Sequence, residues 1–150
     1  MSTAVWGPPI WTLFHTMANK VSETKFPLIK NALFSYIKSI CSNLPCPTCS
    51  AHAKTFLSQI NFSKINDKST FQHFLFTFHN VVNKRKEKPV FDVELLSNYS
   101  KVNLLSAFNN FAAVYKTKGN MKLLADSFHR TQVLTSFRKW FQANASSFSI

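Results

Sequence analysis

The chain has 150 residues, a formal net charge of +12 and a hydrophobic fraction of 45%, and it contains 16 phenylalanines. A chain of this length and apolar content can bury a core, which excludes a disordered protein and favours one domain. No apolar stretch reaches the roughly 18 residues of a transmembrane helix, and residues 1–6 lack the basic region followed by an apolar core that is typical of a secretory signal. We therefore expect a cytoplasmic protein without a membrane partner.

Helical periodicity of apolar residues, together with only 2 glycines, predicts an all-α fold. Pro8 and Pro9 are typical of a helix's first turn, where a missing N–H costs little. Asp92 is a candidate cap for a short helix. Beyond Asn144 the Ser-rich tail is expected to fray. Other helices are expected over about 27–43, from the cysteine pair at 46 onward, over about 69–86, and twice after residue 103, separated by a stop signal at 118–120.

The most informative motif is Cys46-Pro47-Thr48-Cys49, at the start of an apolar-periodic run. Two cysteines at this spacing can form a reducible disulfide or share a metal, and the positive end of a helix dipole stabilises a thiolate. His52 follows Cys49 by about one helical turn and can approach the same site. Cys41 lies on an apolar stripe, so we interpret it as a small buried hydrophobe.

A second group of candidates lies on two helix faces. Trp11 and His15 are four residues apart, so they occupy one stripe of the first helix. Polar residues on the helix over 69–86 also share a stripe, although they are poor helix formers and costly to bury unpaired. This arrangement suggests a polar, planar ligand, and the basic cluster that follows suggests a phosphate. The stripe contains Phe76, His79, Asn80 and Asn83, and the cluster contains Lys84, Arg85, Lys86 and Lys88.

Several alternatives remain open for the cysteine pair. A zinc site needs about four ligands, but no second pair exists and His52 is too close for finger spacing, so no metal is expected. A thioredoxin-like fold requires strands that the pattern lacks. A purely structural disulfide would close a tiny loop. Nucleic-acid binding has only the net charge in its favour and is unlikely. A basic binding module with a structural or zinc-binding pair is the main competitor to a redox disulfide beside an organic cofactor between helices.

Three sequence blocks carry a resemblance to the Erv/ALR family of FAD-linked sulfhydryl oxidases. They occur in the family's order and cover about residues 6–99, which makes the match specific. The blocks are WGPPIWTLFHTMA at 6–18, CPTCSAH at 46–52, and HNVVN at 79–83 followed by KPVFD at 88–92.

This resemblance implies a four-helix bundle with a short fifth helix that holds FAD. Residues 1–102 would form the oxidase domain, and residues 103–150 would be a C-terminal helical extension packed on it. Cys46 would be attacked by an incoming thiolate, and Cys49 would be the sulfur nearest the flavin. Tyr99 falls near the position where the family often has an adenine-packing Trp. The resemblance and the motif blocks give these candidate cofactor-binding residues: Trp6, Gly7, Trp11, His15, His52, His79, Asn80, Asn83, Lys84, Lys88 and Tyr99.

The implied activity is oxidation of protein dithiols to disulfides, with electrons passing through the pair and FAD to molecular oxygen to give hydrogen peroxide. Many family members carry a second, shuttling cysteine pair, which this chain lacks, so substrates would reach Cys46 and Cys49 directly. In this it is similar to compact versions from large DNA viruses, which serve virion proteins in the host cytoplasm or virion. The family also implies a homodimer.

Overall fold

The computed structural model describes residues 3–116 and 124–149. Within these residues the regular elements are all helices, which confirms the all-α prediction. The described residues also contain one isolated antiparallel bridge, between Val21 and Phe148. None of these helices combines the length and apolarity needed to cross a membrane. The elements are α1 (Thr3–Lys20), α2 (Phe26–Ser42), α3 (Pro47–Ser58), η1 (Phe62–Lys64), α4 (Lys68–Arg85), η2 (Val93–Lys101), α5 (Leu104–Tyr115), α6 (Leu124–Ala143) and η4 (Ala145–Ser147).

The start of α1 differs from the prediction. The helix begins at Thr3, so Pro8 and Pro9 lie inside it rather than in its first turn. Each proline lacks the backbone N–H that would otherwise donate to the preceding turn, which weakens the helix at this point. Burial of Trp6, only 5% exposed, offsets this cost because its large ring fixes the first turns against the core.

Side-chain caps fix the starts of several other helices. Asp67 accepts a hydrogen bond from the backbone N–H of Thr70 (2.8 Å), and the Thr70 side chain completes a capping box at the start of α4. Asn103 caps α5 in the same way through Ser106. Asp92 caps the following element as predicted, but η2 is a 3-10 helix of nine residues rather than an α-helix.

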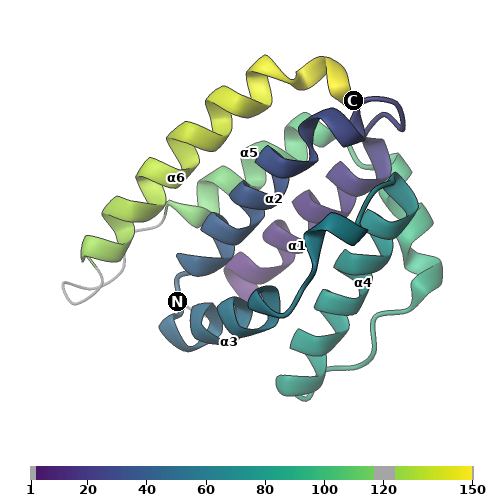
Figure 1. Ribbon diagram of the computed structural model, residues 1–150. Coiled ribbons are helices and arrows are strands. Elements are labelled where there is room, and N and C mark those ends of the chain that lie inside the picture. The colour runs from purple at the N-terminus through teal and green to yellow at the C-terminus, as the bar shows by residue number, and fades with distance from the viewer. Residues whose placement is uncertain (1–2, 117–123, 150) are drawn as a thin grey trace.

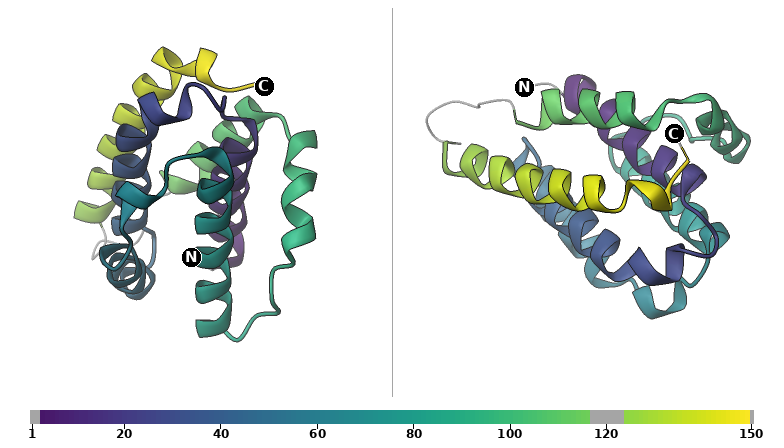
Figure 2. Two further views of the ribbon diagram at one scale, coloured as in Figure 1. Left: turned by 45° about the vertical axis from the view of Figure 1, so that its right-hand side comes forward. Right: turned by 90° about the horizontal axis from the view of Figure 1, so that it is seen from above.

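The helices form a bundle in which α1 packs against α4, η2 and α5, while α2 packs against α3 and α6 (Figure 1). In the side view of Figure 2, η2 stands beside α4 and is joined to it by an extended connection. Tyr36 on α2 fixes part of the contact with α6, since its hydroxyl lies 2.9 Å from the Ser136 hydroxyl and its ring packs on Phe137 and Trp140.

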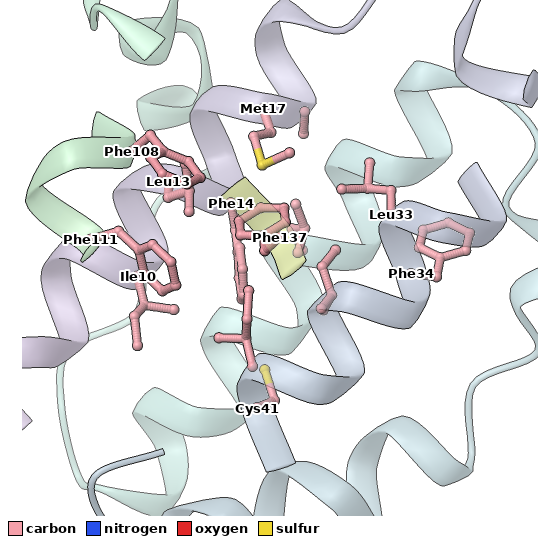
Figure 3. Packing of buried hydrophobic residues seen from close by; sticks show 14 of the residues in the cluster. Ile10, Leu13, Phe14, Met17, Leu33, Phe34, Cys41, Phe108, Phe111 and Phe137 are labelled. Atoms are coloured by element: carbon pink, nitrogen blue, oxygen red, sulfur yellow. The ribbon is translucent and has the colours of Figure 1, made fainter. Parts of the chain in front are cut away.

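The core runs between α1, α2, α4, α5 and α6, with residues of α3 at one edge. Figure 3 shows Phe14 and Phe137 near its centre, with Phe108 on one side and Leu33 on the other. Each such side chain contributes about 1.5–3 kcal/mol by leaving water. Cys41 lies at one end of this core and is 3% exposed, as expected of a small hydrophobe.

The C-terminal tail does not fray. Phe148 is 7% exposed and pairs with Val21, and backbone hydrogen bonds join Ser147 to Ser22 and Ser149 to Lys20. The prediction was wrong because composition alone does not reveal that Phe148 packs on Trp140 and Phe141 of α6 and pairs with the residue that follows α1. The stop signal predicted at 118–120 lies outside the described residues.

Candidate active site

A cavity of about 580 Å³ lies between α1, α3 and α4 and extends to η2. In Figure 1, α3 lies across the lower end of the molecule, where α4 also ends. The predicted site residues that line this cavity are Trp6, Gly7, Trp11, Cys49, His52, His79, Asn83, Lys88 and Tyr99. Four separate stretches of sequence therefore meet at one place.

The two cysteines have different positions at the start of α3. Cys46 is the N-cap residue in extended conformation, and its sulfur accepts a hydrogen bond from the Cys49 backbone N–H at 3.2 Å. Pro47 occupies the first turn, where its missing N–H costs nothing. One helical turn later, Cys49 is 7% exposed and lies in the cavity wall, whereas Cys46 is half-buried and lies outside that wall. The outer sulfur is thus the more accessible one.

The electrostatics distinguish the two sulfurs as well. Burial raises the pKa of Cys46, and its hydrogen bond with Cys49 adds to this effect. For Cys49, burial acts in the same direction, but it is outweighed by hydrogen bonds from Cys46 and Arg85 and by the positive charge of Lys86, so the pKa of Cys49 falls below its ordinary value. Of the two sulfurs, the inner one is the more favoured as a thiolate.

An aromatic stack closes one side of the cavity. The ring centroids of Trp11 and His79 are 4.2 Å apart, and the two ring planes differ by 5°. His79 also stacks on Phe91, with ring centroids 4.4 Å apart. Tyr99 stacks on His15 at 4.9 Å. The cavity therefore has flat, apolar walls that suit a planar ring system.

A histidine pair supports this stack. His15 Nε2 lies 2.9 Å from His79 Nδ1, and His15 is 2% exposed. Burial lowers the pKa of His15 to about 3, with a contribution from His79. Burial, followed by the charge of Lys88, lowers the pKa of His79 to about 4. Both imidazoles are neutral at neutral pH, which lets one ring donate to the other.

The tautomer of the pair follows from the surroundings of His15. No described group accepts or donates at His15 Nδ1, which is fully buried. A buried N–H without a partner costs more than a buried lone pair, so we place the proton on Nε2, from which His15 donates to His79 Nδ1. His79 then keeps its own Nε2–H for a ligand.

The two asparagines of the polar stripe hold the connection after α4. Asn80 forms a pair of hydrogen bonds with the backbone of Phe91, accepting from its N–H at 2.7 Å and donating to its C=O at 3.1 Å. Asn83 donates to the Pro89 carbonyl at 3.3 Å and also lines the cavity. These bonds explain why a polar residue such as Asn80 can be half-buried on a helix. Its amide is paired with the Phe91 backbone and holds the Phe91 ring against the two histidines.

The structure does not bring every predicted residue to the cavity wall. Cys46, His15, Asn80 and Lys84 lie outside it, with His15 and Asn80 behind the wall and Lys84 exposed. Arg85 and Lys86 line it instead, and Phe91 completes the stack. Spacing could have indicated Lys86, because it lies seven residues after His79 on the same helical stripe.

Fold and site together define a class: an all-α redox protein in which a C-x-x-C pair borders a cavity with aromatic walls and a basic rim. Comparison with known proteins agrees. A model of the Erv1 / Alr family matches residues 8–103, which is more than half of the chain. The chain belongs to the Erv1 / Alr family.

Individual relatives are similar over the same part of the chain. A protein of Invertebrate iridescent virus 6 that bears the name putative FAD-linked sulfhydryl oxidase is 34% identical over 92 residues, covering 57% of this chain and 83% of that protein. A FAD-linked sulfhydryl oxidase of African swine fever virus is 32% identical over 101 residues, covering 67% and 84%. The mitochondrial FAD-linked sulfhydryl oxidase of Schizosaccharomyces pombe is 24% identical over 92 residues, covering 61% and 50%. No solved structure matches the chain significantly.

Proposed function

We propose that this chain is a FAD-linked thiol oxidase that forms disulfide bonds in protein dithiols. The observation that carries the proposal is the position of Cys49, whose sulfur lies in the wall of a flat-sided cavity and is favoured as a thiolate. Family membership and the names of the viral relatives support the same activity.

The residues present fit FAD. A cavity of about 580 Å³ has the size of a cofactor site, and the ring planes of Trp11 and His79 suit an isoalloxazine or adenine ring. Trp6 Nε1 is buried with no hydrogen-bond partner among the described residues, so it offers a donor. Lys88 and Arg85 supply positive charge for a diphosphate. When bound, FAD accepts two electrons from the dithiol and passes them to molecular oxygen, giving hydrogen peroxide.

The chain's own part is thiol–disulfide exchange. A substrate thiolate attacks the more accessible Cys46 sulfur of a Cys46–Cys49 disulfide and displaces Cys49 as a thiolate. A second substrate thiolate then attacks the substrate sulfur of the mixed disulfide, which releases an oxidised substrate and the Cys46 thiolate. The inner position of Cys49 keeps its thiolate against the cavity, while His15 holds His79 in one orientation in the opposite wall.

We propose three further properties on the basis of the family and the viral relatives. Oxygen is the final electron acceptor, the enzyme acts in the host cytoplasm or the virion, and two copies associate as a homodimer. Since α5 and α6 cover faces of α1 and α2, a second copy would contact other surfaces of the molecule. Light scattering on the purified protein tests the dimer.

The cofactor is tested by the absorbance spectrum of purified protein. We expect a yellow protein that retains flavin absorbance after dialysis without added FAD. A Trp11→Ala variant should lose flavin, because it removes one face of the ring stack. A colourless protein that holds stoichiometric zinc at the cysteine pair would contradict the proposal and favour the basic binding module.

A further inference from the structure

Lys86 makes a contact to the site that its position in the basic cluster does not predict. Its Nζ donates to Cys49 Sγ at 3.6 Å, and the same ammonium lies 6.0 Å from the centre of the Trp6 ring. Unlike the exposed Lys84 and Lys88, Lys86 is half-buried. A cation at this distance from a sulfur in a partly desolvated cavity interacts with it more strongly than a solvated surface charge would.

The backbone holds Lys86 in this place. Lys86 is the C-cap residue of α4, and the next residues form a Schellman motif. The N–H of Lys88 donates to the Asn83 carbonyl at 2.8 Å, and the N–H of Glu87 donates to the Lys84 carbonyl at 3.2 Å. Glu87 takes the left-handed conformation that this motif requires, with φ of 57°. The side chain of Lys86 therefore leaves the helix at a fixed point, in reach of α3.

We propose that Lys86 is a catalytic residue that stabilises the thiolate of Cys49 each time the Cys46–Cys49 disulfide is opened. This inference rests on the proposed function and adds a specific residue to it. Lys86 touches the reacting sulfur itself, so its effect is on the leaving group of exchange rather than on the fold.

The step balances as an ordinary exchange reaction. The substrate thiolate forms a bond to Cys46 Sγ, the bond between Cys46 and Cys49 breaks, and its electron pair remains on Cys49 Sγ beside the Lys86 ammonium. The substrate sulfur is oxidised and the enzyme disulfide is reduced, with no proton transferred. A leaving thiolate that is better stabilised leaves faster, so Lys86 accelerates substrate oxidation.

The same contact changes the equilibrium. Because Lys86 favours the dithiol state over the disulfide, it raises the reduction potential of the pair and makes the pair a stronger oxidant of substrate thiols. Other groups also contribute to the electrostatic surroundings of Cys49. Arg85 from α4 hydrogen bonds the sulfur, Cys46 faces it from α3, and His52, His79 and Lys88 line the same cavity. Lys86 and Arg85 are the cations that lower the pKa of Cys49.

Iodoacetamide alkylation of Cys49 as a function of pH, in the flavin-loaded protein and followed by mass spectrometry, tests the proposal. The background is Cys46→Ser, in which the serine hydroxyl can keep both the helix cap and a hydrogen bond to Cys49. Lys86→Met retains the apolar stem and removes the charge. We expect its Cys49 to react severalfold more slowly at neutral pH, because loss of the ammonium raises the pKa of Cys49 and each pKa unit changes the thiolate fraction by up to about tenfold. Lys86→Arg should restore most of the reactivity.

Lys54→Met is the matched control, since Lys54 is an exposed lysine on α3 outside the cavity wall. Circular dichroism confirms that each variant folds, and Lys86→Gln replaces Lys86→Met if the latter does not. An alkylation profile in Lys86→Met equal to that of the control would overturn the proposal. Alkylation does not depend on oxygen or turnover, so a protein that consumes no oxygen but shows the Lys86 effect would contradict the proposed function alone.

Discussion

At the scale of single residues, most of the residues that line the site belong to short sequence motifs. The spacing of Cys46 and Cys49, and the stripe that contains His79, indicated a redox pair facing a planar ligand as one of several alternatives, and the family resemblance favoured it. Lys86 was missed because its charge was assigned to a solvated cluster, although its spacing from His79 places it on the polar stripe, and the Schellman turn after α4 holds it beside Cys49. Asn80 was interpreted as a ligand residue from its polarity, but spacing cannot show that its amide is already paired with Phe91.

The histidine pair predicts a pH dependence of stability. The pKa values of His15, about 3, and His79, about 4, lie below the ordinary value of about 6.5. Below pH 6.5 the unfolded chain therefore binds protons that the folded chain does not bind. The stabilising effect is complete above about pH 6.5 and is lost progressively as the pH falls toward about 3.

We expect the free energy of unfolding to fall by about 2 kcal/mol for His15 alone between about pH 7 and pH 5. His15→Gln, which keeps a donor for His79, should flatten this dependence in urea denaturation series. His129→Gln changes an exposed histidine on α6 and serves as the control. Parallel pH profiles for wild type and His15→Gln would show that the pair does not titrate in this way.

At the scale of elements, helix existence was predictable and helix ends were less so. Asp92 was recognised as a cap, but the start of α1 was misplaced because Pro8 and Pro9 are usual at a first turn. The burial of Trp6 overrides that local preference, and such long-range packing cannot be derived from proline positions. The same limitation explains why the tail was wrongly predicted to fray. Phe148 is held by long-range contacts that the polar composition of the tail does not reveal.

The turn after α4 contains a residue in an unfavourable conformation. Glu87 has φ of 57°, which costs an L-residue free energy that glycine avoids. We expect Glu87→Gly to raise the free energy of unfolding by about 0.5–1 kcal/mol in urea denaturation. Glu87→Ala keeps the Cβ atom and should give no such gain. A glycine variant less stable than the alanine variant would mean that the left-handed conformation is not the cost.

The docked tail makes a second prediction for an element. Phe148→Ala should lower the free energy of unfolding by about 2–3 kcal/mol, because its ring packs parallel to Phe141 at 5.8 Å and fills the end of the core. Phe128→Ala on α6 is the matched control, since Phe128 is 62% exposed, and it should change stability by at most about 0.5 kcal/mol. Equal effects of the two substitutions would contradict the docking of the tail.

At the scale of the whole molecule, the arrangement of the helices was the least predictable feature. Amphipathic patterns identify a buried face for each helix but not the helix that covers it. The packing of α5 on α1 and of α6 on α2 brings Phe108 of α5 against Phe137 of α6, a contact between residues far apart in the sequence. The site could be predicted better than the bundle because its residues come in short motifs, while the packing depends on many weak contacts.

The overall charge of +12 is shared between the cavity rim and the outer surface. Net charge alone allowed nucleic acid, an acidic protein or a phosphate-bearing cofactor as partner. The position of Arg85, Lys86 and Lys88 around one cavity favours the cofactor, because those charges converge on the volume beside Cys49.

The central claim is that Cys49 connects substrate thiols to a flavin in this cavity, and oxygen uptake by the purified protein with dithiothreitol tests it most directly. We expect wild type and Cys41→Ala to consume oxygen and release hydrogen peroxide, since Cys41, although it lines the cavity, is 3% exposed and burial raises its pKa to about 12. Cys49→Ala should retain flavin absorbance and consume none. Oxygen uptake that persists in Cys49→Ala, or that is absent from a flavin-loaded wild-type protein, would contradict the account.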